Sequence, residues 1–124
     1  MTQITIIMLI SGLLPIACAG LAKWGFQDYT NREPRAWLAA QEGWRARANA
    51  AQQNSFEIFP LFAASVIFAI LAETEASIIA PICWFFVATR IIYIYFYLTD
   101  KALLRTFVWI LGLGAILKLF LFAV

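Results

Sequence analysis

Four long apolar runs, separated by shorter polar stretches, are the feature that most constrains what this chain can fold into. A helix needs about 20 predominantly apolar residues to cross the hydrocarbon core of a bilayer. Runs at about 4–22, 50–72, 76–98 and 102–124 meet that requirement. Transmembrane β-strands would be shorter and would alternate polar with apolar residues, which none of the runs does. The runs therefore predict an all-α integral membrane protein with four transmembrane helices.

Composition excludes several classes of soluble protein. The chain is 64% hydrophobic and 13% charged, whereas a soluble domain has about a quarter charged residues and about half apolar ones. A globule of this size could not bury so much apolar surface, which excludes a soluble enzyme and a disordered tail. The net charge of +2 is too small to drive phosphate binding, so we expect no nucleic-acid partner.

The residues that usually bind metals are scarce. The chain has no histidine, and its two cysteines, Cys18 and Cys83, lie far apart inside apolar runs. Zinc, haem and iron–sulfur sites all need more ligands than this, so no metal is expected. Both cysteines are predicted to be buried, unreactive thiols.

The connections between the runs differ in length and charge. Residues 23–49 form a long polar loop that carries five of the basic residues, whereas the links at 73–75 and 99–101 are short. Short links favour an up-down-up-down bundle that forms a single membrane domain, 1–124. The positive-inside rule predicts that residues 23–49 and 99–101 are cytoplasmic and that both termini lie on the opposite side.

The first run could instead be a cleaved signal peptide. A signal peptide needs a positively charged start, and no Lys or Arg precedes Lys23. We therefore expect a retained helix, with a kink at Pro15.

Two charged residues, Glu57 and Arg90, lie inside the predicted spans. Each costs about 2.5–3.5 kcal/mol at the centre of a membrane helix, so such residues pair with one another or mark a functional site. Glu57 and Arg90 are predicted to lie at similar depth and to form an ion pair. That pair could lock the bundle, or it could belong to a binding site.

Further polar residues follow helical spacing around these two charges. Three polar residues stand at i, i+7 and i+10 on the second run, and three stand at i, i+3 and i+7 on the third. Each set of three therefore lies on one helix face. They are Arg47, Asn54 and Glu57, and Arg90, Tyr93 and Tyr97. Together with Arg105 at the start of the fourth run, they predict a polar cavity that opens to the cytosol. An interfacial aromatic belt is the alternative explanation for Tyr97.

Two of these patterns resemble those of a known family. The N-x-x-E-x-F-P pattern from Asn54 to Pro60 and the R-x-x-Y-x-x-x-Y pattern from Arg90 to Tyr97 precede an Arg-Thr pair at Arg105. Together they resemble the MAPEG superfamily, the membrane-associated proteins in eicosanoid and glutathione metabolism, over nearly the whole chain. The basic segment 32–35 is similar to bacterial members, which implies a bacterial inner membrane.

The resemblance implies a homotrimer of four-helix subunits that binds glutathione as a co-substrate at subunit interfaces near the cytosolic face. It implies a transferase or peroxidase that acts on lipophilic electrophiles within the membrane lipid, with Arg105 as the catalytic residue that stabilises the glutathione thiolate. The glutathione-binding positions that it implies are Arg47, Asn54, Glu57, Arg90, Tyr93 and Tyr97.

One position departs from the family pattern. Ala50 stands four residues before Asn54, where glutathione-using members usually carry an arginine. This departure favours the alternative function, a non-catalytic trimeric membrane protein that binds a lipid or modulates a partner.

Overall fold

The computed structural model describes residues 1–26 and 28–124, and within them it contains only helices and their connections. The helices, in chain order, are α1 (Thr2–Lys23), α2 (Pro34–Ala39), α3 (Gly43–Leu71), α4 (Ala76–Leu98), α5 (Ala102–Phe120) and the 3₁₀ helix η1 (Leu121–Ala123). α1, α3, α4 and α5 together with η1 are long and apolar enough to cross a membrane. The prediction of an all-α chain with four spans is confirmed.

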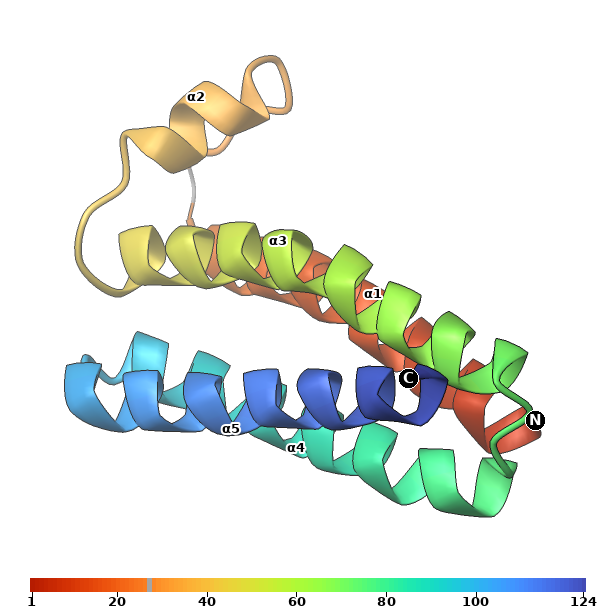
Figure 1. Ribbon diagram of the computed structural model, residues 1–124. Helices are drawn as coiled ribbons and strands as arrows, with labels where there is room; N and C mark the ends of the chain where they lie inside the picture. The colour runs from red at the N-terminus through yellow and green to blue at the C-terminus, as the bar shows by residue number, and fades with distance from the viewer. Residues whose placement is uncertain (27) are drawn as a thin grey trace.

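The four long helices form an up-and-down bundle in which α3 contacts α1, α4 and α5. Both termini and the α3–α4 turn lie together, and we call this the terminal end (Met1, residues 72–75 and Val124) (Figure 1). The described parts of the α1–α3 connection and the α4–α5 turn lie at the other end, which we call the basic end (residues 23–26, 28–49 and 99–101) (Figure 1).

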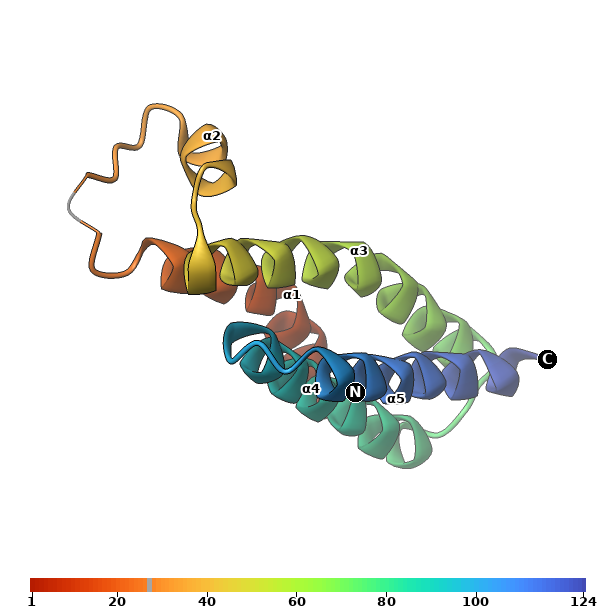
Figure 2. The same cartoon turned by 90° about the vertical axis from the view of Figure 1, so that its left-hand side faces the viewer.

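α3 begins earlier than the second apolar run predicts. It starts at Gly43 rather than near residue 50, and its first two turns pack against α2 and the end of α1. Gly43 has φ +60°, a conformation that favours glycine. Pro60 lies inside α3 and has no N–H for the carbonyl of Phe56. The helix bends near the middle of its length (Figure 2).

The two short turns share one geometry. After α3, Glu73 has φ 57°, and its N–H and that of Thr74 donate to the carbonyls of Ile70 and Ala69 at 2.9 and 3.1 Å. After α4, Asp100 has φ 60° within the same pattern of hydrogen bonds. Both are Schellman motifs, in which the left-handed position usually holds glycine. A side chain at that position is strained.

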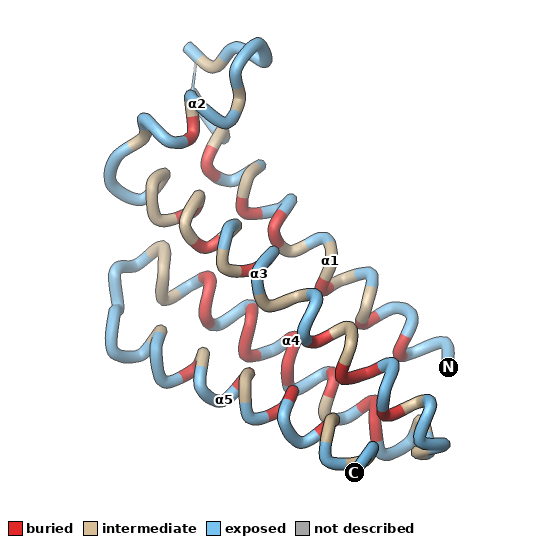
Figure 3. Tube along the Cα trace, turned by 45° about the horizontal axis from the view of Figure 1, so that its top comes forward, coloured by how far each residue is buried: buried red, intermediate tan, exposed pale blue. Residues whose placement is uncertain are grey.

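The half of the bundle near the terminal end has a mostly apolar main core, in which Ser65 is also fully buried. Its centre is the stacked ring pair of Phe62 on α3 and Phe86 on α4, with centroids 3.9 Å apart. Gly112 allows α5 to approach α4, because a Cβ there would lie 2.9 Å from Thr89 Oγ1. Buried positions recur along the inward faces of the four helices (Figure 3).

The half near the basic end has a smaller apolar core and a buried charge. Its apolar members are Cys18, Ala51, Tyr93, Ile94 and Val108. Beside them, Arg90 is only 3% exposed and is the one buried charged residue in the part of the chain that the structure describes. Both cysteines are free and buried, as predicted.

Candidate functional site

A cavity of about 230 Å³ opens between α3, α4 and α5 near the basic end. Its lining comes from three helices that are far apart in the sequence. The residues are Asn54, Tyr93, Tyr97, Arg105, Thr106 and Trp109. Four of the seven predicted site residues therefore meet at one cavity.

Aromatic rings hold the arginine of the cavity in place. Tyr93 and Tyr97 lie one turn apart on α4 and pack edge to face, with ring centroids 5.5 Å apart. The guanidinium carbon of Arg105 lies 4.1 Å from the ring centroid of Tyr97, within the range of a cation–π contact. Arg105 is half-buried in the first turn of α5, where the helix dipole also favours an anion.

Asn54 has a fixed orientation because of its neighbour on α4. Arg90 Nη2 donates to Asn54 Oδ1 at 3.0 Å. A guanidinium has only donors, so the amide oxygen of Asn54 must face Arg90. The Asn54 Nδ2 group is then left to donate to another partner at the cavity.

Arg90 itself lies behind the cavity rather than in its lining. It donates to Ser55 Oγ at 3.2 Å, and its guanidinium carbon is 4.1 Å from the Tyr93 ring centroid. Arg90 Nε and Ser11 Oγ are buried without a hydrogen-bond partner among the described residues. Three polar side chains, Ser11 on α1, Ser55 on α3 and Arg90 on α4, therefore lie together inside the bundle, behind the cavity.

The predicted ion pair between Glu57 and Arg90 is wrong for this chain. Glu57 is exposed on the outer face of α3, whereas Arg90 is buried against Asn54 and Ser55. Helix geometry explains the error. At 100° per residue, Ser55 and Glu57 lie on opposite sides of Asn54 around the helix axis. A cation that contacts both Asn54 and Ser55 therefore faces away from Glu57.

Arg47 also lies outside the cavity. Its Nε and Nη2 atoms donate to the carbonyl oxygen of Leu98 at 3.3 and 3.2 Å. Leu98 is the last residue of α4, and its carbonyl has no partner within the helix. In this chain Arg47 therefore joins the start of α3 to the end of α4.

Four residues of this region were not singled out as site residues by the sequence. Thr106 and Trp109 line the cavity, and the spacing of Trp109, one turn after Arg105, was the available signal. Ser11 and Ser55 gave no signal, because a serine in a membrane helix commonly bonds to its own backbone. Ser55 does so as well, donating to the carbonyl of Ala51 at 2.8 Å.

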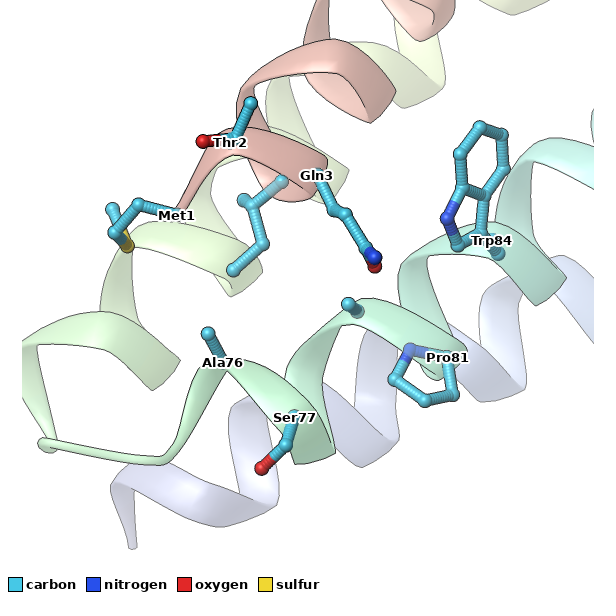
Figure 4. A pocket seen from close by; sticks show the side chains of 9 residues that line it. Met1, Thr2, Gln3, Ala76, Ser77, Pro81 and Trp84 are labelled. Carbon is cyan, nitrogen blue, oxygen red and sulfur yellow. The ribbon is translucent and has the colours of Figure 1, made fainter.

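A larger cavity, of about 560 Å³, lies at the terminal end between the starts of α1 and α4. Gln3 extends from α1 toward α4, where Pro81 and Trp84 form the other side (Figure 4). None of its lining side chains is charged. It therefore offers less chemistry than the smaller cavity at the basic end.

Comparison with known proteins identifies the family. No curated protein and no solved structure matches this chain significantly. A sequence model of the MAPEG family matches residues 3–124, which is nearly the whole chain. Four membrane-spanning helices agree with that match. The chain therefore belongs to the MAPEG family and is an integral membrane protein.

Proposed function

We propose that this protein is a membrane-bound transferase or peroxidase that uses glutathione or a similar acidic thiol against lipophilic electrophiles. The observation that supports the proposal best is the position of Arg105, at a cavity whose other polar groups are donors or hydroxyls. Among the described residues, no carboxylate lines this cavity. The site therefore suits a ligand that supplies negative charge and hydrogen-bond acceptors.

Each polar group of the cavity has a role in this proposal. Asn54 Nδ2 donates to a carbonyl or carboxylate of the thiol peptide, because its amide oxygen is held by Arg90. The hydroxyls of Tyr93, Tyr97 and Thr106 can donate or accept. Glutathione carries two carboxylates and two amide carbonyls, which match a set of groups dominated by donors.

Arg105 promotes the chemical step by favouring the thiolate over the thiol. A fixed positive charge stabilises the anion and so lowers the pKa of the bound thiol. The thiolate sulfur then forms a bond to the electrophilic carbon, and the leaving group departs with its electron pair. With a hydroperoxide, the thiolate sulfur bonds to the terminal oxygen, the O–O bond breaks, and the alcohol leaves after protonation. A second thiol then attacks the resulting sulfenic acid to form the disulfide and release water.

A neighbouring copy of the chain completes the site in this proposal. The cavity of about 230 Å³ is smaller than the 300–1,000 Å³ usual for ligand pockets. Gln53 and Glu57 are exposed on α3, and a carboxylate facing lipid is unfavourable. Contact between copies, in a homotrimer, would cover this face and bring Glu57 to the amino group of the thiol peptide bound to the next subunit.

A non-catalytic lipid-binding or partner-modulating protein is the second candidate. Ala50 favours it, because this position lies on α3 one turn before Asn54 and supplies no charge to the cavity. The two candidates differ in whether Arg105 acts on a thiol.

Replacing Arg105 distinguishes the enzyme from the non-catalytic lipid-binding protein. In Arg105→Leu, conjugation of a generic aryl halide with glutathione should fall about tenfold or more, because one pKa unit corresponds to 1.36 kcal/mol. The thiolate absorbance that appears when glutathione is added should fall with it, while the oligomer and its melting temperature remain unchanged. Arg105→Lys should recover only part of the conjugation rate and of the thiolate absorbance, since an ammonium lacks the planar fork of a guanidinium.

Arg35→Leu is the matched control, because Arg35 is exposed on α2 away from the cavity. The Arg35→Leu protein should catalyse aryl halide conjugation at the rate of the parent protein. If Arg105→Leu also does so, the catalytic role of Arg105 is refuted. If the parent protein gives neither a thiolate signal nor conjugation, the lipid-binding candidate replaces the enzyme, and Ala50→Arg becomes the variant to test for gain of thiol binding.

We also propose that the basic end faces the cytoplasm of a bacterial cell and that the termini lie across the inner membrane. The support is the excess of Lys and Arg at the basic end. A reporter fused after Val124 should be active only if it functions outside the cytoplasm. A cytoplasmic signal from that fusion would reverse the orientation of the cavity.

A further inference from the structure

A second cavity with a different chemistry lies between α4 and α5, toward the terminal end. It has a volume of about 350 Å³ and is open to the surroundings of the bundle. Its lining is apolar except for one lysine: Pro81, Ile82, Phe85, Leu111, Gly114, Ala115 and Lys118. We call it the α4–α5 groove.

Lys118 lies at one end of this groove. Leu111, Gly114 and Lys118 follow one another at i, i+3 and i+7, so they form one stripe along α5. Lys118 is exposed and stands two residues before α5 ends. Such a lysine reaches toward the lipid headgroups while its aliphatic part covers apolar surface.

No ion pair satisfies Lys118 within the described part of the chain, because no carboxylate there lies within 4.0 Å of its ammonium. Glu75, at the same end of the bundle, accepts a hydrogen bond from Ser77 Oγ at 2.9 Å instead. The lipid headgroups around this end of a membrane-spanning bundle would supply phosphate as a counter-ion for Lys118.

The groove itself has room for a hydrocarbon chain. A Cβ added at Gly114 would meet no atom within 4 Å, in contrast to Gly112 two residues earlier, where it would meet Thr89. Phe85 is 48% exposed and Leu111 37% exposed, so both present apolar surface to the bilayer. Acyl chains are the apolar material available at this depth.

We propose that the α4–α5 groove binds one anionic phospholipid of the leaflet at the terminal end. Its phosphate contacts Lys118, and one acyl chain lies in the groove along Gly114 and Leu111. The exposed polar face of α3 is where we propose that another copy binds, and the groove is lined only by α4 and α5. Lipid binding here is independent of thiol chemistry at the other end of the bundle.

Lipid retention by the purified oligomer tests this proposal. Native mass spectrometry is performed after equilibration with dioleoyl phosphatidylglycerol or dioleoyl phosphatidylcholine, which share their acyl chains and differ in net charge. The parent protein should retain one phosphatidylglycerol per chain and several-fold less phosphatidylcholine. Lys118→Gln should lower phosphatidylglycerol retention by roughly fivefold, the effect of one lysine near an anionic surface. Lys118→Arg should preserve retention.

Gly114→Leu tests the groove separately from the charge. The added side chain should fill the groove without a clash and lower retention of both lipids. Two matched controls should retain both lipids like the parent: Gly20→Leu, at a glycine of α1 that also has no atom near its Cβ position, and Lys101→Gln, at the basic end.

Three lipid-retention results would overturn the proposal. They are equal retention of the two lipids by the parent, retention in Lys118→Gln that matches the parent, and a Gly114→Leu protein that keeps both lipids. A Gly114→Leu protein that dissociates into smaller oligomers would show that a second copy occupies the groove, and it would refute lipid binding there as well. Melting temperatures of all variants identify any loss caused by misfolding.

Discussion

The two halves of the bundle are built from the same four helices but use different interactions. Near the terminal end, the main core is mostly apolar and holds no buried charge among the described residues, and rings and small residues bring the helices together at Phe62, Phe86 and Gly112. Near the basic end, a buried arginine, Arg90, takes the corresponding central position, and the helices separate enough to leave a cavity beside Asn54. What distinguishes the halves is the buried charge and the polar lining of the cavity near the basic end, since the terminal half also contains cavities, of about 560 and 350 Å³.

This difference separates stability from function within one small domain. A lipid-solvated helix gains little from the hydrophobic effect when it associates with another, so close packing must hold the bundle together. The terminal half supplies that packing. The basic half can then hold a buried charge and an open cavity, both of which oppose folding.

The largest expected effect on stability comes from the ring stack of the terminal half. Phe62→Ala should lower the free energy of unfolding by roughly 3 kcal/mol, the lower end of the range for such changes in packed cores. Thermal unfolding in detergent measures it. Under the proposed function, the affinity for glutathione of the protein that remains folded should equal that of the parent. A loss of affinity without a loss of stability would contradict the division between the halves.

A smaller loss of stability is expected when the hydrogen bond between Asn54 and Arg90 in the basic half is removed. Asn54→Leu should cost about 1.5–3 kcal/mol, because it removes a hydrogen bond to a buried charge. In a double-mutant cycle with Arg90→Met, the double variant should lose less than the sum of the single losses, with a coupling of at least about 0.5 kcal/mol. Glu57→Gln combined with Arg90→Met serves as the control.

The losses in that control cycle should add, since Glu57 is exposed and Arg90 is buried against other partners. A larger coupling energy between Arg90 and Glu57 than between Arg90 and Asn54 would support the ion pair that the sequence predicted.

The smallest effect concerns the two turns, one at each end. Glu73→Gly and Asp100→Gly should each raise stability by about 1 kcal/mol, because glycine relieves the strain of a positive φ. Glu73→Gly should gain more, since aspartate tolerates the left-handed conformation better than glutamate does. Melting temperatures of the two variants decide the order. A loss of stability in both would mean that the side chains make contacts worth more than the strain.

The sequence alone determined the architecture of this protein. Four apolar runs of membrane length require four helices, because a backbone in lipid must satisfy its own hydrogen bonds. The short links at 73–75 and 99–101 then fix the antiparallel order of the last three helices. Regular spacing also placed Tyr93 and Tyr97 on one face of α4, since residues of one helix face stay together wherever the helix packs. The positions of Asn54 and Arg105 within their own runs placed them at the same end of the bundle.

Only the tertiary structure decided the partners of each polar group. Periodicity places Asn54 and Glu57 near one another on α3, but the rotation of α4 about its axis decides which of the two meets Arg90. That rotation depends on packing in the terminal half, where Phe62 stacks on Phe86 and where the absence of a side chain at Gly112 lets Thr89 pack against α5. A buried cation that donates to amide and hydroxyl oxygens, with the carboxylate left facing outward, is therefore a result of side-chain packing between helices. Spacing along a single helix does not specify that packing.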